Sequence, residues 1–148
     1  MTIYLTLVNL LEDSMGNTKN KVVINWSPYY PEFQEIEFMC PCCGLIKVNR
    51  YAMDKLILAR RKAGVPFVIT SGTRCSRHNE EIGGASGSTH LPETFGSEGF
   101  DIKRISKFDD YKILESLFAV GFNYIKVYKH HIHADTRFRG TSSRIFES

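Results

Sequence analysis

His131-Ile132-His133-Ala134-Asp135, near the C-terminal end of the chain, is the stretch that decides the fold and the site. Polar and apolar residues alternate along it, and successive side chains of a β-strand point to opposite faces. We therefore predict a strand that presents His131, His133 and Asp135 on one face. His130, one position earlier, is expected to point to the other face.

The remaining elements predict an α+β fold. A helix is expected over Arg50 to Ala63, because apolar residues recur there at helical spacing and Gly64 follows them. A second helix, over Lys107 to Val120, has Ser106 as its candidate N-cap. Strands are expected at Val22 to Trp26, Val65 to Thr70, Phe100 to Ile105, Tyr124 to Tyr128 and Ile132 to Arg137. This order predicts a single α+β domain with a small antiparallel sheet and flanking helices.

The composition is that of one globular domain. The chain has 148 residues, of which 43% are hydrophobic and 24% are charged, and both values are ordinary for such a domain. A formal charge of +3 suits a polyanion such as a bacterial wall but is small for a protein that binds nucleic acid. No apolar run is long enough to span a bilayer. We expect a monomer with neither a nucleic-acid nor a membrane partner.

Residues 1–37 are predicted to form a strand and loop segment packed on the main domain, which spans residues 38–148. The apolar residues 3–11 lack a preceding positive charge, and Glu12 and Asp13 stand where a cleavage site would be, so we predict no signal peptide. We therefore expect synthesis in the cytoplasm and action at the cell wall only after release or as part of a virion.

Histidine and carboxylate residues are candidates for a catalytic zinc site, which needs three protein ligands and one open position. His90 follows a glycine-rich loop, Asp101 lies early in a predicted strand, and His133 lies in the last one. Arg74, on a glycine turn, has the chemistry to hold a carboxylate or to stabilise an oxyanion. The alternatives are a surface histidine run that binds metal adventitiously and an Arg74 that pairs with a surface carboxylate.

Four cysteines, Cys40, Cys42, Cys43 and Cys75, form a second group of possible ligands. Cys40 and Cys43 have the spacing of a zinc knuckle, so a structural zinc that also uses Cys75 is one interpretation. Because the usual two-pair spacing is incomplete, we favour a packed cluster of reduced thiols. A disulfide between Cys75 and one of the other three is the remaining alternative.

Six short motifs follow one another between Phe38 and about Arg137. They are Ser71-Gly72-Thr73-Arg74-Cys75, His78-Asn79, Gly83-Gly84-Ala85, Ser88-Thr89-His90, Gly99-Phe100-Asp101-Ile102 and His131-Ile132-His133-Ala134-Asp135. In this order they resemble the M15 family of zinc D-alanyl-D-alanine carboxypeptidases and L-alanyl-D-glutamate endolysins. A small subgroup with a Phe-x-Cys-x-x-Cys-Gly opening, common among phage-encoded proteins, is the most similar.

The resemblance implies that residues 38–148 form an M15-like zinc peptidase domain with a zinc cleft, in which His90, Asp101 and His133 ligate one catalytic Zn²⁺. It also implies that Arg74 binds a substrate carboxylate or carbonyl, and we expect Ser88 beside the substrate. Zinc in such a site would lower the pKa of a bound water toward ~7. Hydrolysis then needs a general base and a proton donor for the leaving amine.

The chain departs from the family pattern in two places. His90 and Asp101 are eleven positions apart, a wider spacing than usual, so residues 91–98 are expected to hold an extra loop that changes the rim of the cleft. Many relatives carry a carboxylate at the position of His130, and the wider group has a His-x-His pair that His131-Ile132-His133 matches. We therefore predict His131 as the catalytic histidine, with His130 second. Asp135 either orients a zinc-bound imidazole or pairs with Arg137 or Arg139.

The function expected from this resemblance is hydrolysis of a D-Ala-D-Ala or L-Ala-D-Glu type bond in peptidoglycan, as an endolysin or another phage-linked wall enzyme. One alternative is an inactive zinc-binding homologue with a structural or wall-binding role. Another is a basic module for nucleic acid whose zinc is held by cysteines, which the modest net charge disfavours.

Overall fold

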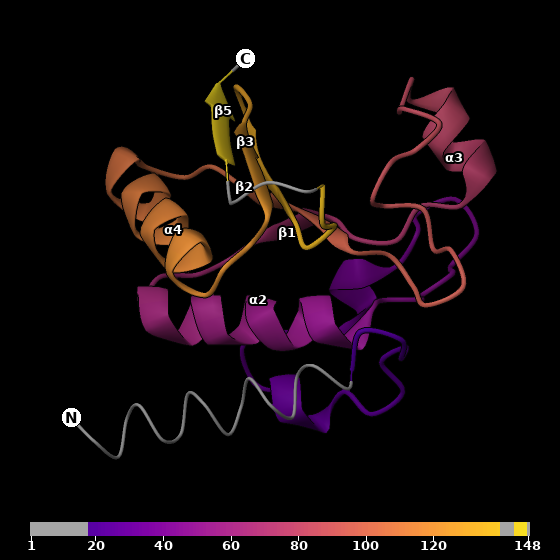
Figure 1. Ribbon diagram of the computed structural model, residues 1–148, viewed down its shortest axis with the longest axis horizontal. Coiled ribbons are helices and arrows are strands. Elements are labelled where there is room, and N and C mark those ends of the chain that lie inside the picture. Colours follow the sequence, from indigo (N-terminus) through magenta and orange to yellow (C-terminus); the bar gives the residue numbers. More distant parts are fainter. Residues whose placement is uncertain (1–17, 140–143, 148) are drawn as a thin grey trace.

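The computed structural model describes residues 18–139 and 144–147, and the predicted apolar segment at residues 3–11 lies outside them. Labels follow Figure 1. In chain order the elements are η1 (Ser27–Tyr29), η2 (Glu35–Phe38), α2 (Arg50–Ala63), β1 (Ile69–Ser71), α3 (Ser76–Glu81), β2 (Gly99–Lys103), α4 (Lys107–Ala119), β3 (Tyr124–Val127), β4 (His131–Asp135) and β5 (Arg144–Glu147).

Five strands form one sheet in the order β1-β2-β4-β3-β5. The neighbouring strands from β1 to β3 pair antiparallel, whereas β5 runs parallel to β3. The predicted α+β fold with a small antiparallel sheet is therefore confirmed. The parallel edge strand β5 was not predicted, because its four residues are too few for an alternating pattern to stand out.

Capping residues set the ends of the two long helices. The side chain of Asn49 accepts a hydrogen bond from the first turn of α2, and Gly64 ends that helix with a left-handed φ of 67°, which glycine adopts without strain. The side chain of Ser106 caps α4 in the same way. Both predicted helices are confirmed, and α4 ends at Ala119, one residue before the predicted end.

Two of the predicted strands differ most from the structure. In the stretch from Val65 to Thr70, only the last two residues enter β1, although Val65 and Phe67 are buried. The stretch from Val22 to Trp26 makes only an isolated bridge, between Val22 and Asn49. A short apolar run has the same sequence signal whether it is buried as a strand or as irregular backbone.

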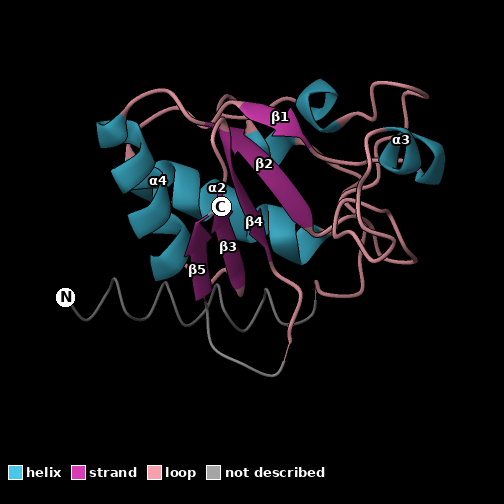
Figure 2. Cartoon of the chain, turned by 90° about the horizontal axis from the view of Figure 1, so that it is seen from above, coloured by secondary structure: helices cyan, strands magenta, loops and turns pink. Residues whose placement is uncertain are grey.

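The sheet has one apolar face and one polar face. Apolar strand residues are buried in a core with α2 and α4, and this core contains Phe100, Ile102, Ile125, Ile132, Met53, Leu56, Ile113 and Leu117. Because strand side chains alternate, Asp101, His131 and His133 point to the opposite face. The long helices thus cover one side of the sheet (Figure 2), and the other side carries the polar residues.

The described part of the N-terminal segment packs on the same core. Val23, Tyr29 and Phe33 are buried within it, and the Tyr29 hydroxyl donates to Asp54 of α2 at 2.6 Å. Residues 18–37 therefore share one hydrophobic core with the helices and strands of the described chain up to β4.

None of the helices in the described residues is both long and apolar enough to cross a bilayer.

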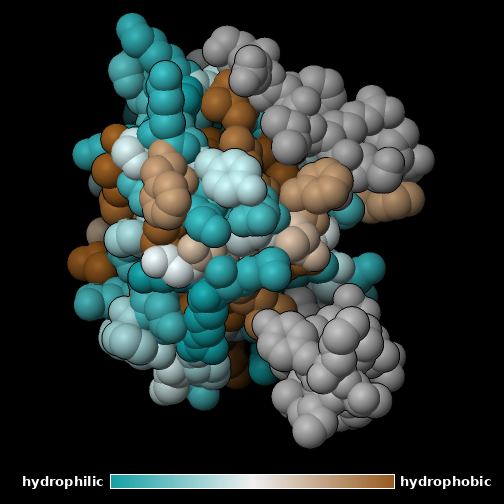
Figure 3. All heavy atoms as spheres, turned by 90° about the vertical axis from the view of Figure 1, so that its left-hand side faces the viewer, coloured by the Kyte–Doolittle hydropathy of each residue, from teal (hydrophilic) through white to brown (hydrophobic). Residues whose placement is uncertain are grey.

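Helix α4 exposes three aromatic side chains, those of Phe108, Tyr111 and Phe118. Figure 3, viewed from the α4 side, shows hydrophobic side chains interrupted by hydrophilic ones. Scattered exposed apolar residues of this kind are normal on a protein surface.

Candidate metal centre and its cleft

Strand pairing brings two of the predicted ligands together. Asp101 of β2 lies directly opposite His133 of β4 in the antiparallel register, and both side chains point to the polar face. His90 reaches them from the loop after α3, and its backbone carbonyl accepts a hydrogen bond from the N–H of Arg74 at 2.9 Å. All three side chains are buried or nearly so.

The three candidate ligand atoms form a triangle of the size that zinc requires. His133 Nδ1 lies 2.8 Å from Asp101 Oδ1, and His90 Nε2 lies 3.2 Å from both the same oxygen and His133 Nδ1. Tetrahedral zinc with bonds of ~2.0–2.1 Å places its nitrogen and oxygen ligands about 3.3–3.4 Å apart. The residues therefore fit a zinc ion with only a small outward adjustment.

Each imidazole is oriented through its other nitrogen. His90 Nδ1 lies 2.7 Å from the carbonyl oxygen of Gly72, which accepts the ring N–H and leaves Nε2 for a metal. His133 Nε2 lies 3.0 Å from Asp135 Oδ2. Asp135 in turn accepts two hydrogen bonds from Arg139, at 2.7 and 3.0 Å. The two roles considered for Asp135, orienting an imidazole and pairing with an arginine, thus occur together.

Arg74 is held against the metal centre. Its Nη2 donates to Asp101 Oδ2 at 2.8 Å, and its Nε donates to the Ser71 hydroxyl at 2.9 Å. Asp101 therefore directs one carboxylate oxygen to the two histidines and the other to Arg74. The alternative pairing of Arg74 with a surface carboxylate does not occur, because its partner is the buried Asp101. Arg74 also lines the cleft.

The two histidines predicted for proton transfer have different surroundings. His131 lines the cleft, its Nε2 lies 3.8 Å from Asp101 Oδ1, and its ring stacks on Tyr128 with a centroid distance of 4.5 Å. His130 is exposed in the turn before β4 and is not part of the cleft lining. As predicted from the alternation, only His131 shares the face of His133.

Burial and close contacts set the charge states of the centre. Burial favours a neutral Asp101, but hydrogen bonds from His133 and His90 outweigh it and hold the Asp101 pKa well below its usual range. Burial also lowers the pKa of His133, but hydrogen bonds to Asp101 and Asp135 reverse this and raise it. For His131, burial dominates and lowers the pKa, so this imidazole is neutral at pH ~7 and able to accept a proton.

The centre lies in an open cleft of about 410 Å³ that Ser88 also lines. None of residues 91–98 contributes to its lining, so the extra loop expected there lies away from the residues around the metal centre. The loop packs instead on the start of α2, where Asn49 donates to the carbonyl of Phe95 at 3.1 Å. A larger cavity of about 550 Å³ borders this loop and contains none of the predicted site residues.

Some site residues were not predicted. Thr89 lies 3.4 Å from both His133 Nε2 and Asp135 Oδ2, and Gly99 leaves the space that the Thr89 side chain fills. Tyr128 supports His131 by stacking. Thr89 stands within the Ser88-Thr89-His90 motif, which was a usable signal, whereas nothing in the sequence marked Tyr128.

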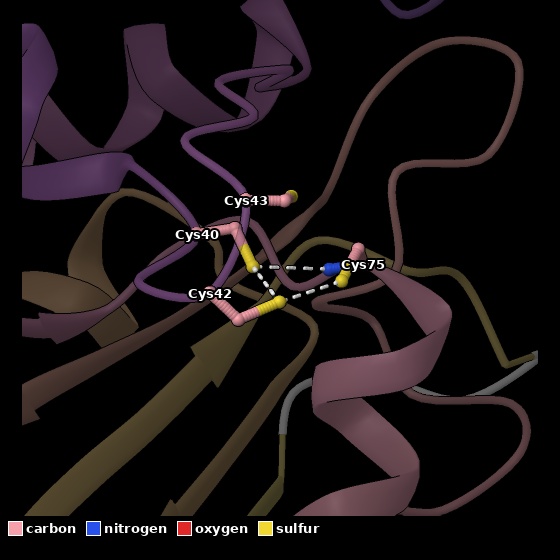
Figure 4. A group of neighbouring side chains, drawn as sticks. All are labelled: Cys40, Cys42, Cys43 and Cys75. Atoms are coloured by element: carbon pink, nitrogen blue, oxygen red, sulfur yellow. Dashed lines mark hydrogen bonds between the residues drawn. The ribbon is translucent and has the colours of Figure 1, made fainter.

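The cysteines gather outside the cleft. Cys40, Cys42, Cys43 and Cys75 place their sulfurs within 4.8 Å of one another, and none of them lines the cleft. Figure 4 shows the loop that carries the first three facing the N-terminal end of α3, where Cys75 stands. The interpretation as packed thiols fits only Cys40, which is buried, because Cys43 is exposed and the other two are partly exposed.

A family model described as Peptidase M15 matches residues 31–135 of the chain, a span that contains every candidate ligand described above. A comparison with curated proteins gives no significant match.

Proposed function

Because the chain belongs to the peptidase M15 family, we propose that it is a zinc-dependent metallopeptidase that hydrolyses a short peptide bond in bacterial peptidoglycan. The observation that carries the proposal is the ligand triangle of His90, Asp101 and His133, with edges of 2.8 to 3.2 Å, open to a cleft. Three protein ligands beside an accessible cleft are the arrangement of a catalytic rather than a structural zinc.

Zinc held by these three residues would supply an acidified water and a polarised carbonyl. His131 stands beside this position, with Nε2 3.8 Å from Asp101 Oδ1, and is held by the Tyr128 ring. We assign it the proton transfer: Nε2 accepts a proton from the attacking water and returns it to the leaving amine. The two carboxylates in the cleft are less suited to this role. Asp101 and Asp135 each already accept hydrogen bonds from a histidine and an arginine.

Arg74 has two roles in this proposal. It fixes the second oxygen of Asp101, and as a cation in the cleft wall it attracts a substrate carboxylate or an oxyanion. Stem peptides of peptidoglycan carry carboxylates beside both candidate bonds, D-Ala-D-Ala and L-Ala-D-Glu. Ser88, also in the wall, offers a hydroxyl to the peptide backbone.

The setting that we propose is phage-linked lysis or processing of the wall. It rests on the resemblance of the Phe38 to Gly44 motif to phage-encoded relatives. The formal charge of +3 suits an anionic wall.

The test is digestion of purified peptidoglycan by the zinc-loaded protein, with His131→Ala as the control that keeps the zinc ligands. The appearance of new amino groups would show that a peptide bond is hydrolysed. Mass spectrometry of the soluble products would then identify that bond. Release of free D-alanine indicates a carboxypeptidase, and separation of the glycan strands from peptides that begin with D-glutamate indicates an endopeptidase. Bound zinc with no hydrolysis of either bond would overturn the proposal in favour of an inactive zinc-binding homologue.

A further inference from the structure

We propose that Cys40, Cys42, Cys43 and Cys75 bind a second Zn²⁺ ion, which is structural and separate from the catalytic centre. This inference does not depend on the proposed function. It rests on the convergence of four sulfurs from two separate chain segments. Cys42 in the first segment and Cys75 in the second are 33 positions apart in the sequence.

The distances suit tetrahedral sulfur coordination. The Cys40 and Cys42 sulfurs are 3.8 Å apart, those of Cys42 and Cys75 are 3.1 Å apart, and all four lie within 4.8 Å of one another. Zinc–sulfur bonds of ~2.3 Å in a tetrahedron place sulfurs about 3.8 Å apart. One ion at the centre of the group would therefore need only small shifts of the four side chains.

The backbone of the first segment is shaped to turn its sulfurs inward. The N–H of Gly44 donates to the carbonyl of Cys40 at 2.9 Å, and the N–H of Cys40 donates to the carbonyl of Leu45 at 2.8 Å. Gly44 has a positive φ of 76°, which a residue with a side chain rarely adopts. This tight turn, with two residues between Cys40 and Cys43, has the ligand spacing of a structural zinc site.

Hydrogen-bond donors point at the sulfurs as they do around bound thiolates. The backbone N–H of Cys75 donates to Cys40 Sγ at 3.4 Å, and that of His78 donates to Cys75 Sγ at 3.4 Å. Arg77 Nη2 lies 3.6 Å from Cys42 Sγ. Each thiol loses its proton to solvent as it binds zinc, so the ion with four thiolates carries a net negative charge that Arg77 partly offsets.

Neither competing explanation accounts for all four residues. Hydrophobic packing does not explain the exposed Cys43 or the partly exposed Cys42 and Cys75. A disulfide between Cys42 and Cys75 would use two sulfurs and leave unexplained why Cys40 and Cys43 converge on them.

The position of this second site gives it a structural role. Cys75 directly follows Arg74, and the N–H of Thr73 donates to the carbonyl of Phe38 at 3.0 Å. Zinc at the cysteines would therefore tie the loop after η2 to the turn that holds Arg74 and the carbonyl of Gly72 against the catalytic centre.

The experiment is a metal count and a cobalt titration on the full chain, with Cys43→Ser and His133→Ala as complementary variants. We expect two zinc ions per wild-type chain, one in each variant, and thiolate-to-cobalt charge-transfer absorption in wild type and His133→Ala that is lost in Cys43→Ser. Cys43 is exposed, so its replacement spares the core, and circular dichroism checks the fold.

The proposal is overturned if wild type binds a single zinc that His133→Ala loses, or if no thiolate-to-cobalt absorption develops. A mass that shows a Cys42–Cys75 disulfide in freshly purified, unreduced protein would also overturn it. Should Cys43→Ser fail to fold, the absorption retained by His133→Ala still decides, because that variant keeps all four cysteines. None of these readouts uses hydrolysis, so they stand apart from the test of the peptidase.

Discussion

His133 Nδ1 lies 2.8 Å from Asp101 Oδ1, although the two residues are 32 positions apart in the chain. Their strands pair so that the two residues stand directly opposite, and a shift of one residue in that register would turn His133 into the hydrophobic core. The packing of Ile132 and Ala134 on the helix side thus fixes the geometry of the metal site on the other side.

His131→Ala should lower kcat by about 10²–10⁴-fold, the usual contribution of a general acid–base residue, while the zinc content stays that of wild type. The matched control is His130→Ala, because that neighbouring side chain is exposed and lies outside the cleft lining. Steady-state kinetics on a soluble stem peptide would measure both. Equal losses in the two variants would remove His131 from the mechanism.

Asp135→Ala should weaken zinc binding by about 10–100-fold, because it removes the acceptor that orients His133. Arg139→Ala is the control, since it removes the ion pair with Asp135 but leaves the His133 contact. Competition with a coloured chelator measures both affinities. If Arg139→Ala weakens zinc binding as much as Asp135→Ala, the ion pair rather than the hydrogen bond to His133 is what matters.

Zinc binding at the catalytic centre should weaken as the pH falls. Hydrogen bonds to Asp101 and Asp135 outweigh burial and raise the pKa of metal-free His133, so a proton competes with zinc below that raised pKa, starting above the ordinary value of about 6.5. Above it the neutral imidazole binds zinc without this competition. Chelator competition over a pH series in Cys43→Ser would isolate the catalytic site, and an affinity independent of pH would contradict this assignment.

Gly72→Ala should destabilise the fold by about 1–3 kcal/mol, the usual range for overpacking. A Cβ at Gly72 would lie 2.8 Å from the Phe38 Cα and 3.0 Å from its carbonyl oxygen, so the turn that holds His90 and Arg74 would have to move. Gly87→Ala is the control, because a Cβ there meets nothing within 4 Å. Thermal unfolding compares the two, and an unchanged melting temperature in Gly72→Ala would show that the turn accommodates the methyl group.

The sequence predicted the parts of the fold that depend on local chemistry. Asn49, Gly64 and Ser106 end or begin helices through their own backbone and side-chain preferences, and these boundaries were predicted within one residue. Alternation in β4 separated His131 from His130. By contrast, β5 is recognised only by its parallel pairing with β3, and four residues with no strong pattern cannot reveal such a partner.

The candidate metal ligands His90, Asp101 and His133 were predicted from the order of short motifs that resembles a known family. The structure brings these three residues together. The contact of Arg74 with Asp101 and the support of His131 by Tyr128 depend on the folded geometry and left no trace in spacing. The grouping of the Cys42 sulfur with the other three cysteine sulfurs likewise depends on the folded turn at Gly44.

The most direct test of the central claim compares zinc content and peptidoglycan hydrolysis in wild type and His133→Ala. The account predicts that the variant loses one zinc ion, keeps the zinc at the cysteines, and no longer releases amino groups or D-alanine from purified peptidoglycan. Hydrolysis at the wild-type rate by His133→Ala, or a variant that keeps every zinc ion of the wild type, would contradict a catalytic zinc at His90, Asp101 and His133.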